Sequence, residues 1–361
     1  MKLTLNRTGL KYQSDVINLM RFPLMVAIVF IHNDLMNFRY GTNYVNESLT
    51  VFPTIFNIIS GGICRIAVPL FFVISGYLFF YNLNEKSAIN YINKLHRRVQ
   101  TLVIPYVLWN TLYIGFFAIS QQIFPSYTSG NNKLIVDYSV VDYIHCYWDI
   151  IGGLFPINGS FWFLRDLIIV SFLSPIIYWI IRISKGYIIL LLLLLWINDI
   201  GTVGQCGVLR IDSFLFYSIG AWLSSRNLPI AIHCRRTIKL ILFVLMAICI
   251  IGNIYNPLFT KGIIILGLFL VPSYFLDVQL KKKFQKNRLL QSSTFFLYAF
   301  HGVLITFLGK LSVRFFLVTY DWQFIVLYIL LPVIVISISI ITYKILDSIA
   351  PRILRVLIGK R

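Results

Sequence analysis

The 361-residue sequence contains few charged side chains and very few acidic ones. Asp, Glu, Lys and Arg make up only 12% of it, and 13 acidic residues stand against 32 basic ones. Soluble domains average about 25% charged residues. Hydrophobic residues reach 58%, and the mean hydropathy is +0.80. This composition excludes both a water-soluble globular enzyme and a disordered chain.

Several other patterns are missing as well. The five cysteines form no Cys-x-x-Cys pair and no Cys/His cluster with zinc spacing, so we expect neither a metal site nor a disulfide scaffold. The sequence lacks the short alternating strands of ~10 residues that build a transmembrane barrel. It also has no detectable internal repeat, which argues against a transporter built from inverted repeats. The remaining class is a helical membrane protein.

What the sequence does contain is a series of long apolar runs. About 20 apolar residues in a helix cross the ~30 Å hydrocarbon core of a bilayer. The sequence therefore predicts an all-α, polytopic membrane protein of about ten transmembrane helices, in which the fifth and sixth are short. The predicted spans are residues 16–37, 60–82, 98–124, 160–183, 186–200, 210–225, 237–254, 260–277, 292–310 and 322–346.

The basic residues are distributed unevenly among the connecting segments. With the N-terminus in the cytoplasm, the cytoplasmic segments hold 23 Lys and Arg residues and the external segments hold 6, while Arg21, Arg65 and Arg165 fall within spans. This asymmetry follows the positive-inside rule, so the net charge of +19 reflects topology and we expect no nucleic-acid partner. We predict that both termini are cytoplasmic. We also predict that residues 1–361 form one transmembrane domain without an appended soluble domain, and that the first run is an uncleaved anchor.

The first span carries two polar residues that share a helix face. Arg21 and His32 are eleven residues apart, which at 100° per residue is about 20° past three full turns and about 16 Å along the axis. A buried charge is costly in a bilayer and usually faces a cavity or a partner. Arg21 is predicted near the cytoplasmic surface and His32 toward the outer half. Taken alone, they also fit a snorkelling Arg and a hydrogen-bonded core His.

Polar residues in other spans follow similar patterns. Arg65 is predicted at the outer entry of the second span, and Ser75-Gly76 lies on its face, where small residues allow close approach of a helix or of a thin ligand. Arg165 and Asp166 are adjacent, so they point about 100° apart on a helix and are predicted to pair with other groups. Tyr298 and His301 are three residues apart and share a face, as a hydrogen-bonded pair would.

In combination, these motifs resemble the acyltransferase-3 family of integral membrane O-acyltransferases. The resemblance runs in order along the whole chain, and the second-span motif is its most specific part. The matching residues are Arg21 and His32, then Arg65 with Val68-Pro69-Leu70-Phe71-Phe72 and Ser75-Gly76-Tyr77-Leu78, the basic pair Arg97-Arg98 before Pro105-Tyr106, the segment Trp162-Phe163-Leu164 with Ser174-Pro175, and Tyr298 with His301.

The resemblance implies transfer of an acetyl group from cytoplasmic acetyl-CoA to a hydroxyl of a surface or lipid-linked polysaccharide, in a bacterial inner membrane and without a metal. It implies that His32 is the base or the acyl acceptor, and that Arg21, Arg65 and Arg165 complete the catalytic set. Arg97 and Arg98, on the inner loop, would bind the phosphates of the donor, and a groove at Ser75-Gly76 would pass its pantetheine arm. Trp162, Tyr298 and His301 would contact the saccharide.

Two other functions fit parts of the same pattern. One is transfer of succinyl or another acyl group by the same kind of enzyme. The second is a transporter or flippase for a lipid-linked glycan, which also needs many spans and intramembrane charges. A membrane scaffold would leave the in-span Arg and His residues without a role. The sequence does not specify an oligomeric state.

Overall fold

A computed structural model describes residues 7–35, 49–81, 88–124, 133–148, 156–201, 210–281, 287–315, 318 and 320–359. Within these ranges the secondary structure is entirely helical. The chain ends themselves, residues 1–6 and 360–361, lie outside the described residues. The helices are α1 (Arg7–His32), α2 (Val51–Ile59), α3 (Ala67–Phe80), α4 (Ala88–Arg98), α5 (Ile104–Ile123), α7 (Val140–His145), α8 (Trp162–Phe172), α9 (Ser174–Ile183), α10 (Tyr187–Ile197), α11 (Ile211–Ser225), α12 (Arg236–Tyr255), α13 (Phe259–Leu280), α14 (Arg288–Phe315), α15 (Asp321–Ile349) and α16 (Pro351–Leu357).

The prediction of a polytopic helical membrane protein is confirmed, but the count of about ten spans is not. In the described ranges, seven helical segments are long and apolar enough to cross a membrane, and the α8–α9 pair, bent by 62°, makes an eighth if it counts as one span. The predicted spans 186–200 and 210–225 correspond to α10 and α11, which have only 11 and 15 residues. Both are shorter than the ~20 residues that a straight span requires.

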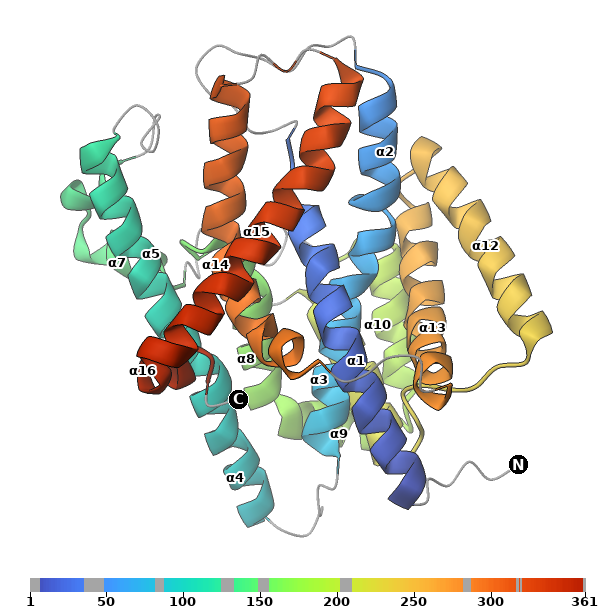
Figure 1. The fold of residues 1–361 in the computed structure, drawn as a ribbon. Coiled ribbons are helices and arrows are strands. Elements are labelled where there is room, and N and C mark those ends of the chain that lie inside the picture. Colours follow the sequence, from blue (N-terminus) through green and yellow to red (C-terminus); the bar gives the residue numbers. More distant parts are fainter. Residues whose placement is uncertain are drawn as a thin grey trace.

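The helices form an elongated bundle in which α1 and α3 are central (Figure 1). α2, α14 and α15 extend to the upper end of the view, whereas α4, the start of α1 and α16 lie in the lower half. We call the lower end the predicted cytoplasmic face because of the charge distribution. α12 packs on α13 and α2 but leaves most of its side chains exposed, among them Leu240, Phe243 and Ile251. Such an apolar outer surface suits contact with lipid.

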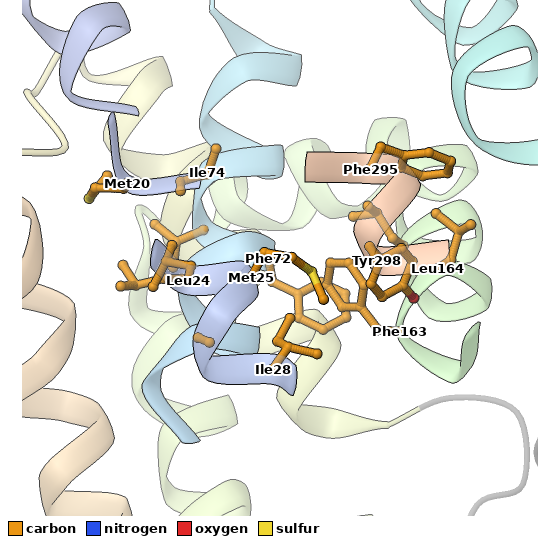
Figure 2. Close-up of a cluster of buried hydrophobic side chains, with 14 of the residues drawn as sticks. Met20, Leu24, Met25, Ile28, Phe72, Ile74, Phe163, Leu164, Phe295 and Tyr298 are labelled. Carbon is orange, nitrogen blue, oxygen red and sulfur yellow. The ribbon is translucent and has the colours of Figure 1, made fainter. Parts of the chain in front are cut away.

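The core forms where four helices from distant parts of the chain meet (Figure 2). Because apolar side chains gain no burial energy against lipid tails, packing depends on close van der Waals fit. Phe163 of α8 makes edge-to-face contacts with Phe72 of α3 and Tyr298 of α14, with ring centroids 4.7 and 6.0 Å apart. Met25 and Ile28 of α1 lie beside this group (Figure 2) and are buried. This core holds the middle of the bundle together.

Two glycines allow α3 and α11 to pack with their backbones in contact. A Cβ on Gly220 of α11 would collide with the Val73 carbonyl oxygen and would lie 2.7 Å from the Tyr77 nitrogen, both on α3. A Cβ on Gly76 would similarly collide with the Tyr217 carbonyl oxygen. Small residues at such positions are the usual basis of tight helix association in membranes.

Replacing Gly220 with Ala should therefore force α3 and α11 apart. Overpacking of this kind costs about 1–3 kcal/mol, and we expect the upper part of that range because backbone atoms cannot rotate away. The thermal unfolding midpoint in detergent measures the effect. Gly115 is the matched control because a Cβ there meets no atom within 4 Å. A Gly220→Ala variant as stable as Gly115→Ala would contradict the backbone contact.

Candidate functional site

His32 is the last residue of α1 and lines a cavity of about 360 Å³. The other walls come from α5, from the segment that leads into α8, and from α14. This volume lies in the range of small-molecule sites, which combine apolar walls with a few polar groups. Besides apolar residues, the wall carries Tyr113, Asn158, Ser160, Trp162, Thr306 and Lys310. The cavity thus brings predicted residues His32 and Trp162 together.

A second cavity of about 380 Å³ adjoins the first between α5 and α14. The two share Tyr113, Phe116, Val303 and Phe307 in their walls. The second cavity is almost wholly apolar, since Tyr113 and the indole of Trp109 are its only lining side chains with a polar atom. The cavity beside His32 therefore continues into an apolar space at the α5–α14 boundary.

His301 of α14 lies behind His32, with the two ring centroids 5.2 Å apart. Its Nδ1 is 2.7 Å from the Tyr298 carbonyl oxygen, which can only accept, so Nδ1 carries the proton and donates. The Nε2 of the neutral ring is then an acceptor, and it has no hydrogen-bond partner among the described residues. His301 is fully buried and is not part of the cavity wall. The structure places His301 against His32, and its contact with the saccharide stays a prediction.

Tyr298 is also placed behind the wall. Its hydroxyl donates to the Ser160 carbonyl oxygen at 2.8 Å, and its ring stacks on Phe161 with centroids 5.4 Å apart. The side chain therefore fixes the segment that leads into α8. Tyr298 and His301 do share the helix face that their spacing predicted, but their side chains do not hydrogen-bond to each other: the Tyr298 hydroxyl donates to the Ser160 carbonyl oxygen and the His301 ring to the Tyr298 carbonyl oxygen.

Arg65 occupies a break in its span and not the outer entry. The helical segment continues from Val51 to Phe80, and Arg65 sits in the short 3-10 turn Ile63–Ile66 between α2 and α3. Its side chain is exposed and lies within electrostatic range of Asp34, Arg210 and His32. The structure thus places Arg65 near the His32 end of α1. Helical wheel geometry from Arg65 to Gly76 does not hold through the 3-10 turn.

Arg165 and Asp166 pair with each other, so the prediction that they bind separate partners is wrong. The Nε and one terminal nitrogen of Arg165 are each 3.0 Å from the same Asp166 oxygen. The second Asp166 oxygen accepts the Ser213 hydroxyl of α11 at 3.0 Å. Both charged side chains are almost fully buried. The long Arg side chain can curl back along the helix, which an estimate from Cα directions alone does not include.

Arg210 is not among the site residues predicted from the sequence, where it is one of the six basic residues of the external segments. Its guanidinium lies over the ring of Trp162, 4.0 Å from the centroid, and binds both carboxylate oxygens of Asp212 at 3.0 and 2.6 Å. A stacked and paired guanidinium is held in one orientation. In the sequence, the spacing of Arg210 and Asp212 directly before an apolar run is the pattern that could have indicated this ion pair.

The predicted cytoplasmic face carries a basic cluster, which we define as Arg21, Lys94 and Arg98. Arg98 turns inward, donating to the Ser75 carbonyl oxygen at 3.1 Å and lying 5.6 Å from the Phe79 ring centroid. It is within electrostatic range of Arg21 and of Lys94. Lys94 was not predicted. Arg97 also lies within electrostatic range of Lys94, but its side chain is exposed.

The sequence predicts Arg97 and Arg98 on a loop, but the structure places them in a helix. They end α4, and the π-helical turn Val99–Val103 connects them directly to α5, so residues 89–123 form one continuous helical segment. Single π turns rotate the following helix and are frequent at functional sites. Both arginines precede this turn, and their adjacent positions at the end of α4 leave Arg97 exposed and Arg98 turned inward.

Ser75-Gly76 serves helix packing. Gly76 faces the α11 backbone, so the close approach of a neighbouring helix, one of the two alternatives for these small residues, is observed. Ser75 offers its carbonyl oxygen to Arg98.

In the described residues, no group of three His, Cys, Asp or Glu side chains comes together as a metal site. The site consists of an imidazole-lined cavity at the His32 end of α1 and the basic cluster beside Arg21, near the middle of the same helix. This arrangement, in a bundle of apolar helices, defines a polytopic membrane protein with a buried candidate active site.

Comparison with known families identifies the kind of protein. The profile of a family described as an acyltransferase domain matches residues 15–344, and the chain belongs to this acyltransferase-3 family. It is similar to the succinoglycan biosynthesis protein ExoH of Rhizobium meliloti (strain 1021), with 27% identity over 165 residues. That match covers 45% of the chain and 41% of the relative, so the chain aligns with less than half of the relative's length. No solved structure matches the chain significantly.

Proposed function

We propose that the protein transfers an acetyl group from cytoplasmic acetyl-CoA to a hydroxyl of a cell-surface or lipid-linked polysaccharide, in a bacterial inner membrane. The observation that carries this proposal is the position of the two sites on one helix. Arg21 belongs to the basic cluster and His32 lines the cavity, about 16 Å further along α1. Membership of an acyltransferase family and similarity to a protein named for succinoglycan biosynthesis support the acyl transfer and the saccharide.

The basic cluster suits the phosphates of the donor. Arg side chains bind phosphate oxygens with charge-assisted hydrogen bonds, and Lys adds a point charge. The acyl group would travel from there toward His32 on the thin pantetheine arm. Buried apolar side chains of α1 such as Met25 and Ile28 (Figure 2) lie between Arg21 and His32 along the helix, so an arm that follows this helix must displace them. Methionine is the side chain best suited to such rearrangement.

At His32 two routes lead to the same product. In the direct route, the acceptor hydroxyl attacks the thioester carbonyl, its proton passes to His32, and the carbon–sulfur bond breaks to release CoA thiolate. In the covalent route, an imidazole nitrogen of His32 attacks the thioester carbonyl and the carbon–sulfur bond breaks to release CoA thiolate. The acceptor hydroxyl then attacks the acyl-imidazole, the carbon–nitrogen bond breaks, and the released imidazole takes up the hydroxyl proton. Arg65 and Arg165 would stabilise the oxyanion that forms in either route.

One observation favours a second donor. Lys310 lines the His32 cavity, and an ammonium at that position would pair with a carboxylate at the end of a succinyl group or on an acidic sugar. Relative turnover of acetyl-CoA and succinyl-CoA by one preparation decides between the two donors. A flippase would turn over neither.

The donor site is tested by calorimetry of acetyl-CoA binding in nanodiscs. Arg98→Ala should weaken binding about tenfold or more, because a hydrogen bond between charged groups contributes about 1.5–3 kcal/mol. Arg97→Ala is the matched control, since it removes the same charge from an exposed neighbour and should change affinity little. Equal effects of the two variants would point to general charge attraction in place of a defined site. No binding by folded wild type would contradict the proposed function.

A further inference from the structure

The hydroxyl of Tyr113 on α5 is inserted into the backbone of α14. It donates to the Ala299 carbonyl oxygen at 3.2 Å and accepts from the Val303 amide at 3.0 Å. In a regular α-helix the Val303 amide bonds to the carbonyl four residues earlier, which is that of Ala299. The hydroxyl therefore bridges the two groups of one helical hydrogen bond. Insertion of a side chain into this ladder is a recognised cause of local helix bending.

Asn158 holds the same turn of α14 from a second direction. Its side-chain amide donates to the Ala299 carbonyl oxygen at 3.2 Å, and its own carbonyl oxygen accepts the Ser160 hydroxyl at 2.7 Å. The Asn158 backbone amide donates to Asn110, which like Tyr113 lies on α5. Tyr113, Asn158 and Asn110 thus form a buried polar network across three parts of the chain. A fully satisfied network of this kind fixes geometry more than isolated bonds do.

Gly302 lets this network approach α14. A Cβ there would lie 3.1 Å from the Tyr113 hydroxyl oxygen and 3.4 Å from the Asn158 side-chain oxygen, so any larger residue would push the network away. His301 is the preceding residue, within the turn that Tyr113 bridges. The network therefore hydrogen-bonds to the turn of α14 that contains His301, the residue whose ring contacts His32.

We propose that Tyr113 is a positioning residue that acts through His301. By holding the turn between Ala299 and Val303, its hydroxyl fixes the depth and orientation of the His301 ring, whose centroid lies 5.2 Å from that of the His32 ring. His32 in turn is held in one orientation at the cavity wall. The consequence for catalysis rests on the proposed role of His32, whereas the consequence for the two rings does not.

The first test removes only the hydroxyl. Tyr113→Phe should lower kcat about tenfold, the factor that corresponds to one lost hydrogen bond of about 1.4 kcal/mol, and leave KM for acetyl-CoA nearly unchanged. Tyr106→Phe is the matched control, because Tyr106 lies on the same helix and its hydroxyl donates to the Tyr147 carbonyl oxygen and not to the backbone of α14. Equal activity of the two variants would overturn the proposal.

A second comparison asks whether Tyr113 acts through His301. In a His301→Gln background, Tyr113→Phe should cause no further loss of kcat, since the group that it positions is gone. An independent tenfold loss there would mean that Tyr113 acts on the substrate directly and would overturn the proposal. If Tyr113→Phe does not fold, Asn158→Ala takes its place, because it removes the other donor to Ala299.

A third measurement does not depend on activity. Nitrogen-15 NMR of the imidazole groups reports which ring nitrogen carries the proton, and the chain has only five histidines to assign by substitution. Tyr113→Phe should change the His301 and His32 signals, and Tyr106→Phe should not. Unchanged signals would refute the positioning role even in an active enzyme. Changed signals in a protein that turns over no acyl-CoA would support the positioning role and contradict only the proposed function.

Discussion

Replacing His32 with Ala should reduce acyl transfer by about a hundred- to ten-thousand-fold, the usual contribution of a positioned general base. A sugar hydroxyl is a poor nucleophile until its proton is removed, and His32 is the imidazole on the wall of the cavity. The measurement is transfer of labelled acetyl from acetyl-CoA to membrane saccharide. Because His32 is at the end of a helix and only partly buried, truncation should leave folding intact.

His145→Ala is the matched control for this substitution. His145 ends the short helix α7 and is outside the cavity wall, so its loss should leave transfer unchanged. Added imidazole should partly restore His32→Ala if the histidine serves as a base, since the vacated cavity can admit the small ring. A well-expressed His32→Ala protein with wild-type activity would exclude both routes. Recovery of labelled acetyl-His32 after acid quench would select the covalent one.

Replacing Asp166 with Ala should produce the largest loss of stability. The carboxylate accepts from Arg165 on one oxygen and from Ser213 on the other, and removing one partner of a buried ion pair costs about 3–5 kcal/mol. Ser213→Ala is the control with a smaller expected loss of stability, because it removes a single hydrogen bond of about 1 kcal/mol. Thermal unfolding in detergent, followed by size-exclusion chromatography, measures both.

A double substitution separates the structural from the catalytic role of this pair. Arg165→Met with Asp166→Ala removes both charges, and apolar replacement of a whole buried pair is often neutral for stability. We expect the double variant to regain much of the lost stability but to remain impaired in transfer, because Arg165 is proposed to stabilise the oxyanion. A stable and fully active double variant would show that Arg165 has only a structural role.

The sequence by itself determined the class of the protein and the polar residues worth testing. Hydropathy and the cost of a charge in a bilayer are properties of each segment alone, so the helical membrane class, Arg21, Arg65, Arg165 and His32 could be found without any knowledge of packing. The two short predicted spans, residues 186–200 and 210–225, are not confirmed as spans because hydropathy and length describe each segment alone. The depth of α10 and α11 in the bundle depends on the helices packed around them.

The tertiary structure alone decided which of these residues meet. The 3-10 turn at Arg65, the π turn after Arg98 and the 62° bend between α8 and α9 rotate the helices that follow them, so faces predicted from a constant 100° per residue do not hold across these breaks. Contacts between distant segments, such as Arg210 on Trp162 and Tyr113 within α14, depend on helix packing that no local pattern encodes. The site is therefore built from residues whose types are visible in the sequence but whose partners are set only by the packed bundle.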